Sequence, residues 1–152
     1  MKILIAERIR ADHEEVRGIV TDGFHGIGRE DVEVHVAANR SRFVFTGKAW
    51  PELPPNRTTD PATRFLVQIV MPQRPSRTGF PYIWKYPRLK TAPELVANCW
   101  QERLLAVAAH EAYHVKQFRL QMRRSEVTAE RWAGRALERL RAQEIREMPT
   151  PF

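Results

Sequence analysis

The sequence predicts an α+β fold: an N-terminal helix, then a small sheet of three or four strands, then two C-terminal helices. Three observations support this order. Apolar residues recur at helical spacing near the start, β-branched and alternating segments occupy the middle, and most of the remaining chain has a helical pattern. With 43% hydrophobic and 28% charged residues, the 152 residues are expected to form a single domain, 1–152, with one core.

The first predicted element is an amphipathic helix over residues 3–24. Its apolar residues recur at helical spacing between charged ones, and Gly23 and Gly26 mark its end. The residues that form this apolar face are Ile5, Ile9, Val16, Ile19, Val20 and Phe24.

Strands are predicted next. Residues 31–37 alternate between polar and apolar side chains, residues 39–41 have turn composition, and residues 43–46 form a second apolar segment. The two segments are therefore expected to pair as a hairpin. Residues 63–71, closed by Pro72, are the strongest predicted strand because they are rich in β-branched and aromatic residues.

The second half of the chain is predicted to be a long loop and two helices. The loop, residues 73–90, is unusually rich in aromatic residues. A helix is expected over residues 91–123, with Thr91 as its N-cap, and a final helix from Ser125 to about Arg146.

The first of these helices contains a His-Glu-Ala-Tyr-His sequence at residues 110–114. Residues four apart lie one turn above each other on a helix, so His110 and His114 can bind one divalent ion. Glu111 would then lie beside the ion, where a carboxylate can take a proton from a metal-bound water and pass it to a leaving amine. The apolar run 104–109 just before the motif favours a buried helix, whose polar residues need partners.

A catalytic zinc needs a third protein ligand and leaves its fourth position to water. The next helix offers Glu126 and Glu130. A straight antiparallel helix pair would instead bring residues 134–138 level with the histidines, which keeps Glu138 as a candidate. Glu126 can reach the metal if the helices cross at an angle or if the first helix ends soon after Phe118.

The two motifs together resemble the gluzincins, zinc metallopeptidases in which HExxH is followed by a helix with the pattern ExxA[D/E]xxA. Residues 110–114 match the first pattern and residues 126–133 match the second. The short chain is similar to the compact members called minigluzincins.

The resemblance implies a zinc-dependent endopeptidase that hydrolyses peptide bonds with a zinc-activated water. It implies that His110, His114 and Glu126 bind Zn²⁺ and that Glu111 is the general base. It also implies that Glu130 holds a ligand histidine by its other ring nitrogen.

Two further features are candidates for substrate binding. In the gluzincin plan a strand above the motif helix offers its free edge to an extended peptide, and residues 63–71 are our candidate for that strand. The hydroxyl of Tyr82 or Tyr86 could donate a hydrogen bond to the oxyanion formed during peptide hydrolysis. The alternatives are that the strand is internal and that the aromatic residues anchor the loop.

The formal net charge of +7 favours acidic partners, either a protein or peptide substrate or nucleic acid, although an Arg-rich composition alone also explains it. The alternative function is therefore a zinc-stabilised, basic binding or regulatory module associated with nucleic acid, without proteolysis. No membrane partner is expected: charge interrupts the N-terminal apolar residues, and no apolar stretch is long enough to span a bilayer. We therefore expect a cytoplasmic protein, and the single cysteine, Cys99, excludes an internal disulfide.

Overall fold

Residues 1–149, which the computed structural model describes, form three helices and six strands. A four-stranded mixed sheet has the spatial order β1 (Lys2–Ile5), β2 (Val32–Asn39), β4 (Phe65–Pro72), β3 (Thr46–Ala49). A separate two-stranded sheet consists of β5 (Tyr82–Trp84) and β6 (Leu95–Ala97). The helices are α1 (His13–Gly23), α2 (Trp100–Arg119) and α3 (Glu126–Glu147), so the predicted α+β class is confirmed.

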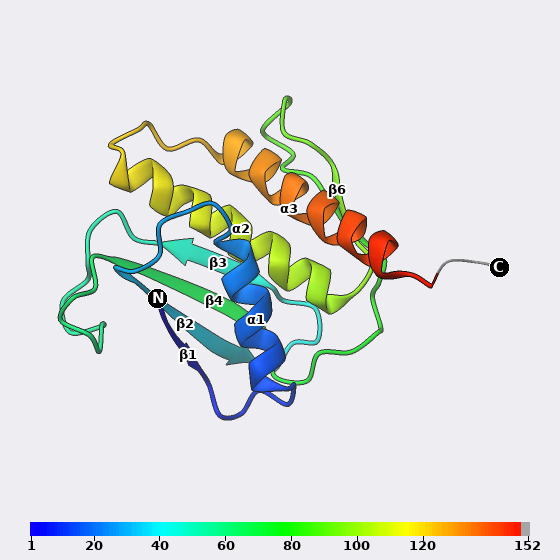
Figure 1. Ribbon diagram of the computed structural model, residues 1–152, viewed down its shortest axis with the longest axis horizontal. Coiled ribbons are helices and arrows are strands. Elements are labelled where there is room, and N and C mark those ends of the chain that lie inside the picture. The colour runs from blue at the N-terminus through cyan, green and yellow to red at the C-terminus, as the bar shows by residue number, and fades with distance from the viewer. Residues whose placement is uncertain (150–152) are drawn as a thin grey trace.

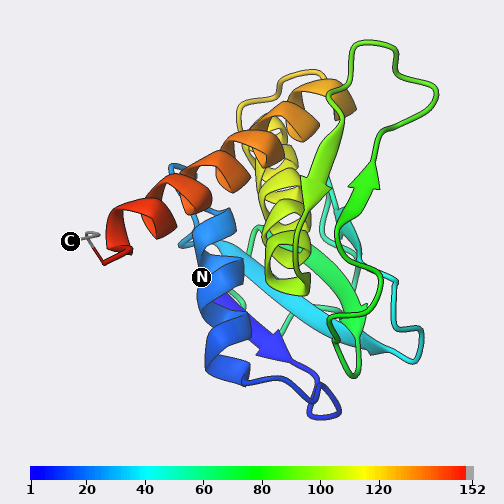
Figure 2. The same cartoon turned by 90° about the vertical axis from the view of Figure 1, so that its right-hand side faces the viewer.

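Helix α2 lies at the centre of the molecule. It contacts α1, α3, β3 and β4, whereas α3 packs on α2 and on the two-stranded sheet, with Leu95 of β6 beside it (Figure 1). Figure 2 shows the same layers from the side, with α1 and α2 next to the sheet and α3 outside them. The approach of α1 to α2 requires a glycine, because a Cβ atom at Gly23 would lie 2.6 Å from the Cβ of Ala108.

The hydrophobic core fills the space between the sheet and these two helices. Alternate residues of the central strands β2 and β4 face α1 and α2 and are almost fully buried, as expected for a sheet covered on one face by helices. The fully buried side chains of this core include Val16, Val20, Val34, Val67, Ile69, Met71, Leu104 and Val115.

The start of the chain differs from the predicted helix over residues 3–24. Residues Lys2–Ile5 form β1, which pairs in parallel with β2, and α1 begins only at His13. Pairing with β2 gives backbone groups of this segment partners, such as the carbonyl of Val36 that accepts from the N–H of Ala6, and it buries Ile3, which outweighs the helical spacing. The helix starts where Asp12 caps it by accepting hydrogen bonds from the next backbone N–H groups.

The predicted hairpin of residues 31–37 with residues 43–46 is wrong. Strand β2 lies between β1 and β4 and pairs with both in parallel. Both edges of β2 are therefore already paired, which leaves no edge for a hairpin partner. Strand β3 begins at Thr46 and pairs antiparallel with β4. The local alternation of apolar residues could not show which strand would become the neighbour of β2.

The predicted strand over residues 63–71 is present as β4, but it is an internal strand. Because β4 lies between β2 and β3, it has no free edge. The choice of residues 63–71 as the edge strand is therefore wrong. The strand with a free edge next to α2 is β3.

The helix predicted for residues 91–123 is shorter. Residues Leu95–Ala97 form β6 and pair with β5, because Leu95 and Ala97 bury their side chains in strand alternation. The chain turns into α2 after Cys99 and leaves it at Leu120, and Gln121 has a left-handed backbone with φ of 52°.

The prediction for the last helix, residues 125–146, is close to the observed α3. Ser125 caps it by accepting a hydrogen bond from the backbone N–H of Thr128. Among the described residues, no helix is both long and apolar enough to cross a membrane.

Candidate metal centre

Helix α2 holds the two histidines of the HExxH motif in the interior of the protein. His110 and His114 are 5% and 0% exposed, on a helix that is covered by α1, α3 and the sheet. Their Nε2 atoms lie 3.0 Å apart, and the rings are nearly perpendicular with centroids 4.8 Å apart. Spacing of four residues on one helix face therefore brings two nitrogen ligands to one point.

Glu126, the first residue of α3, completes a group of three ligand atoms. Its Oε2 lies 2.9 Å from Nε2 of His110 and 3.3 Å from Nε2 of His114, and the ligand atoms of the three residues all lie within 4.8 Å of one another. Two imidazole nitrogens and one carboxylate oxygen are the ligands of a common type of catalytic zinc site.

The end of α2 decides which glutamate reaches the histidines. Because α2 ends at Arg119, directly after Phe118, α3 begins at the level of His114. The straight antiparallel arrangement is therefore not formed, and Glu138 is exposed, outside the group of ligand atoms. The geometry favours Glu126 as the third ligand.

Each histidine is oriented through its second ring nitrogen. Nδ1 of His110 lies 2.7 Å from Oε1 of the buried Glu130, and Nδ1 of His114 lies 2.8 Å from Oε1 of the buried Gln117. Both acceptors favour a proton on Nδ1, so the two Nε2 atoms, which face each other, are the ring nitrogens available to a metal ion. Trp84 supports this arrangement by donating its indole N–H to Oε2 of Glu130 at 3.0 Å.

The electrostatics of the group favour a bound cation. The hydrogen bond with His110 and the neighbouring charges lower the pKa of Glu126 to about 2. Burial alone would lower the pKa of His110, but Glu126 and Glu130 outweigh it and raise that pKa to about 9. Carboxylates that hold a proton on His110 would also hold a metal cation there.

Glu111 lies beside this group but takes no part in it. It is 6% exposed, and its Oε2 has no hydrogen-bond partner among the described residues. Burial raises the pKa of Glu111 to about 7, although the nearby His110 acts in the opposite direction. A buried carboxylate with an oxygen that lacks a donor is expensive to maintain, and such groups are common where proton transfer is required.

Strand β3 passes directly over Glu111. A Cβ atom added at Gly47 would lie 2.5 Å from Cγ of Glu111, so no larger residue fits at this position without moving the carboxylate. Gly47 therefore allows the edge strand to approach the site closely.

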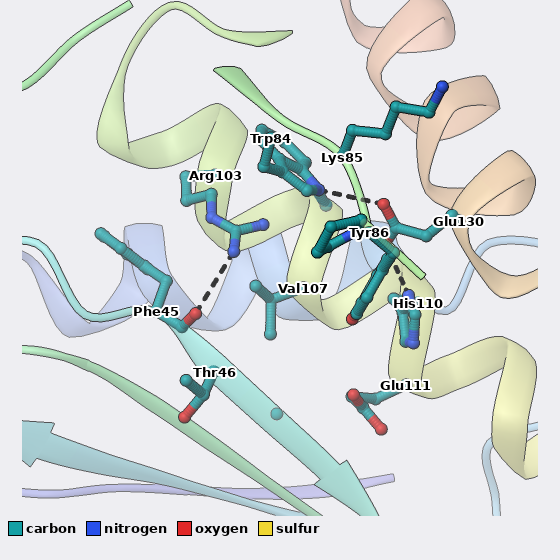
Figure 3. A pocket seen from close by; sticks show the side chains of 13 residues that line it. Phe45, Thr46, Trp84, Lys85, Tyr86, Arg103, Val107, His110, Glu111 and Glu130 are labelled. Atoms are coloured by element: carbon teal, nitrogen blue, oxygen red, sulfur yellow. Dashed lines mark hydrogen bonds and ion pairs between the residues drawn. The ribbon is translucent and has the colours of Figure 1, made fainter. Parts of the chain in front are cut away.

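A cavity of about 370 Å³ opens in front of Glu111 and His110. One wall is the β3 segment, the opposite wall is α2, and the residues after β5 cover the third side (Figure 3). The side chains that line it include Phe45, Trp84, Lys85, Tyr86, Arg103, Val107 and Glu130. A cavity of this kind beside a group of metal ligands can hold a substrate segment.

The two tyrosines predicted as oxyanion donors occupy different places. Tyr86 lines the cavity, with its ring centroid 6.1 Å from that of His110. Burial and the carboxylates of the site raise the pKa of Tyr86 to about 12, so its hydroxyl stays a hydrogen-bond donor. Tyr82 does not line the cavity: its ring stacks on Trp84 with centroids 5.7 Å apart.

The structure adds four residues that the sequence analysis missed. Gln117 could have been found, because it lies three residues after His114 on the same helix face. Arg103 also lies on the face of His110, about two turns earlier. Trp84 and Gly47 reach the site through tertiary packing and gave no local signal.

Comparisons with protein-family models, curated proteins and solved structures found no match for the chain. The function must therefore be inferred from the geometry and chemistry of the site.

Proposed function

We propose that the protein is a zinc-dependent endopeptidase of the gluzincin type, similar to the minigluzincins. The observation that carries the proposal is the convergence of His110, His114 and Glu126 beside a buried Glu111 that has an unpartnered oxygen. A purely structural zinc site has no use for a free carboxylate next to the metal. A cavity at this carboxylate provides space for a peptide.

The residues fit Zn²⁺ by their chemistry. Two imidazoles and one carboxylate supply three ligands, and both imidazoles are held by hydrogen bonds through Nδ1, as is usual for zinc ligands. When bound, zinc would polarise the scissile carbonyl and lower the pKa of its water to about 7.

Glu111 is the general base in this proposal. It accepts a proton from the attacking water as the water oxygen bonds to the carbonyl carbon, and it delivers the proton to the amine nitrogen when the C–N bond breaks. Its pKa of about 7 suits both halves of this transfer. In the same proposal Tyr86, which lines the cavity, donates a hydrogen bond from its hydroxyl to the carbonyl oxygen as negative charge develops there.

The free edge of β3 is the proposed docking site for the substrate backbone. One edge of β3 pairs with β4, and an extended peptide can pair with the other by main-chain hydrogen bonds. The peptide would then lie over Gly47 and along the cavity wall formed by α2. The net charge of +7 favours acidic protein substrates.

The test is cleavage of casein, a disordered acidic protein, together with measurement of bound metal. We expect zinc to copurify, a chelator to abolish cleavage, and added zinc to restore it. The chelated protein should stay folded, because the core between the sheet, α1 and α2 does not include the site.

A different result would support the alternative function. A zinc-stabilised nucleic-acid module would unfold on chelation, leave casein intact, and bind a duplex oligonucleotide with a steep salt dependence. That combination would contradict the peptidase proposal.

A further inference from the structure

Arg103 lies at the far end of the cavity from the metal centre. It shares one face of α2 with Val107, His110 and Glu111, and it lines the cavity with them. Seven residues of helix separate it from His110, which is about 10 Å along the helix axis. Figure 3 shows its guanidinium between Phe45 and Trp84, away from Glu111.

The charge of Arg103 has no carboxylate partner among the described residues. Its one hydrogen bond within residues 1–149 is a long one, from Nη2 to the carbonyl oxygen of Phe45 at 3.4 Å. Other half-buried arginines are paired: Arg119 with Asp31, and Arg141 with Glu102. Arg103 is also half-buried and stands in the first turn of α2, where the helix dipole disfavours a cation.

The guanidinium is nevertheless held in place by aromatic rings. It lies 4.1 Å from the ring centroid of Trp84 and 5.4 Å from that of Tyr82. Stacking fixes the plane of the guanidinium and leaves N–H groups free to form the paired hydrogen bonds that carboxylates accept. Lys85, the other cation at the cavity, points its amine away from Arg103 (Figure 3).

The two acidic residues that line the cavity do not pair with Arg103, and Glu111 lies about two helical turns away from it, beside His110. Glu130 lies on the other side of Trp84 and accepts hydrogen bonds from the indole and from His110. An anion for Arg103 must therefore come from a molecule in the cavity.

We propose that Arg103 binds a carboxylate of the peptide substrate, either an acidic side chain or a free C-terminus; this assignment rests on the proposed peptidase function. The distance along α2, at about 3.3 Å per residue of extended peptide, places the carboxylate about three residues from the scissile bond. The β3 wall gives a similar separation, since Phe45 faces Arg103 and Gly47, two residues later, faces Glu111.

The first experiment is a positional scan with fluorogenic peptides. A neutral parent peptide carries a single Glu or a single Gln at each position in turn, and mass spectrometry identifies the cleaved bond. In the wild type we expect a Glu-over-Gln ratio in kcat/KM of about 10–100 at one position, from the charge-assisted hydrogen bonds. Arg103→Met should bring this ratio to about 1, and Arg103→Glu should replace it by a preference for Lys.

Three controls accompany the scan. Arg135→Met removes the same charge from the exposed face of α3 and should keep the ratio. Arg103→Lys keeps the charge but not the planar guanidinium, so part of the Glu-over-Gln ratio should remain. This variant tests the carboxylate site even if Arg103→Met folds poorly. Peptides that end at the selected position as free acid or as amide distinguish a C-terminal carboxylate from a side-chain carboxylate.

A binding measurement separates this inference from the peptidase proposal. Fluorescence anisotropy would compare labelled Glu and Gln peptides on Glu111→Gln protein, with and without Arg103→Met. If the Glu peptide binds about 10-fold tighter only when Arg103 is present, the carboxylate site stands even if the wild type cleaves nothing. If peptides are cleaved with the same Glu-over-Gln ratio by wild type and Arg103→Met, the carboxylate site is overturned and the peptidase proposal stands.

Discussion

Two buried carboxylates of this protein, Glu33 on β2 and Glu111 on α2, have opposite environments. Glu33 is 0% exposed and accepts hydrogen bonds from the backbone N–H groups of Thr59 and Asp60, from the Thr59 hydroxyl and from His35. Glu111 is 6% exposed and has an oxygen without any partner among the described residues.

The two pKa values shift in opposite directions. Burial alone would raise the pKa of Glu33, but the hydrogen bonds from His35, Thr59 and Asp60 lower it overall. Burial raises the pKa of Glu111 to about 7. A fully hydrogen-bonded carboxylate ties the loop before β4 to the sheet, whereas a carboxylate with one unpartnered oxygen beside a cavity remains able to exchange protons.

The largest expected effect is the loss of peptide cleavage in Glu111→Gln. If Glu111 is the general base, casein cleavage by the zinc-loaded protein should fall by about 10²–10⁴-fold. The melting temperature should not fall, because Oε2 has no hydrogen bond to lose. Equal cleavage rates for the wild type and the variant would remove the assigned role of Glu111.

Removing a hydroxyl that lines the cavity beside Glu111 should lower activity more than removing a hydroxyl outside the cavity. Tyr86→Phe removes a hydroxyl beside the metal group and should lower kcat by about 10²-fold, as loss of an oxyanion donor does. Tyr82→Phe is the matched control and should have little effect, since Tyr82 does not line the cavity. A larger loss for Tyr82→Phe would reverse the assignment.

The same Glu→Gln change at Glu33 should affect stability and not catalysis. Glu33→Gln replaces charge-assisted hydrogen bonds and should lower the free energy of unfolding by about 2–3 kcal/mol, measured by urea denaturation at neutral pH. The folded variant should keep the kcat of the wild type. A stability loss at Glu111→Gln as large as that at Glu33→Gln would remove the contrast between the two sites.

Substitutions of the glutamates of α3 should lower zinc affinity by amounts that depend on how close each glutamate lies to the histidines. Glu130→Ala should weaken zinc binding by about 10–100-fold, since Glu130 acts on the metal through His110. Glu126→Ala should weaken it more, and Glu138→Ala, an exposed control on α3, should not change it. Zinc affinity measured with a competing chelator would show the order, and a filled site in Glu126→Ala with an empty site in Glu130→Ala would reverse the two roles.

The smallest effect concerns acid stability. The folded-state pKa of Glu33 lies below its ordinary value of 4.5, so its contribution is fully present above that pH and is lost as pH falls through the folded pKa. Urea denaturation at a series of pH values should therefore show the wild type losing its advantage over Glu33→Gln as the solution becomes acidic. An advantage that persists unchanged at the lowest pH would contradict this account of Glu33.

Local periodicity was sufficient to predict the parts of the candidate site that lie within one helix. His110 and His114 meet because helical residues four apart share a face, and Glu126 and Glu130 lie one turn apart for the same reason. The α+β class and the position of α3 were also predictable from composition and spacing. In each case the relevant distances are set by the geometry of a single element.

Relations between elements were decided by the tertiary structure. The end of α2 at Arg119 selects Glu126 over Glu138, and the parallel pairing of β1, β2 and β4 leaves β3 as the edge strand over Glu111. The meeting of Arg103 with Phe45 and Trp84 likewise joins segments far apart in the chain. Such contacts depend on which packing buries the most apolar surface while satisfying the backbone, and no short stretch of sequence contains that information.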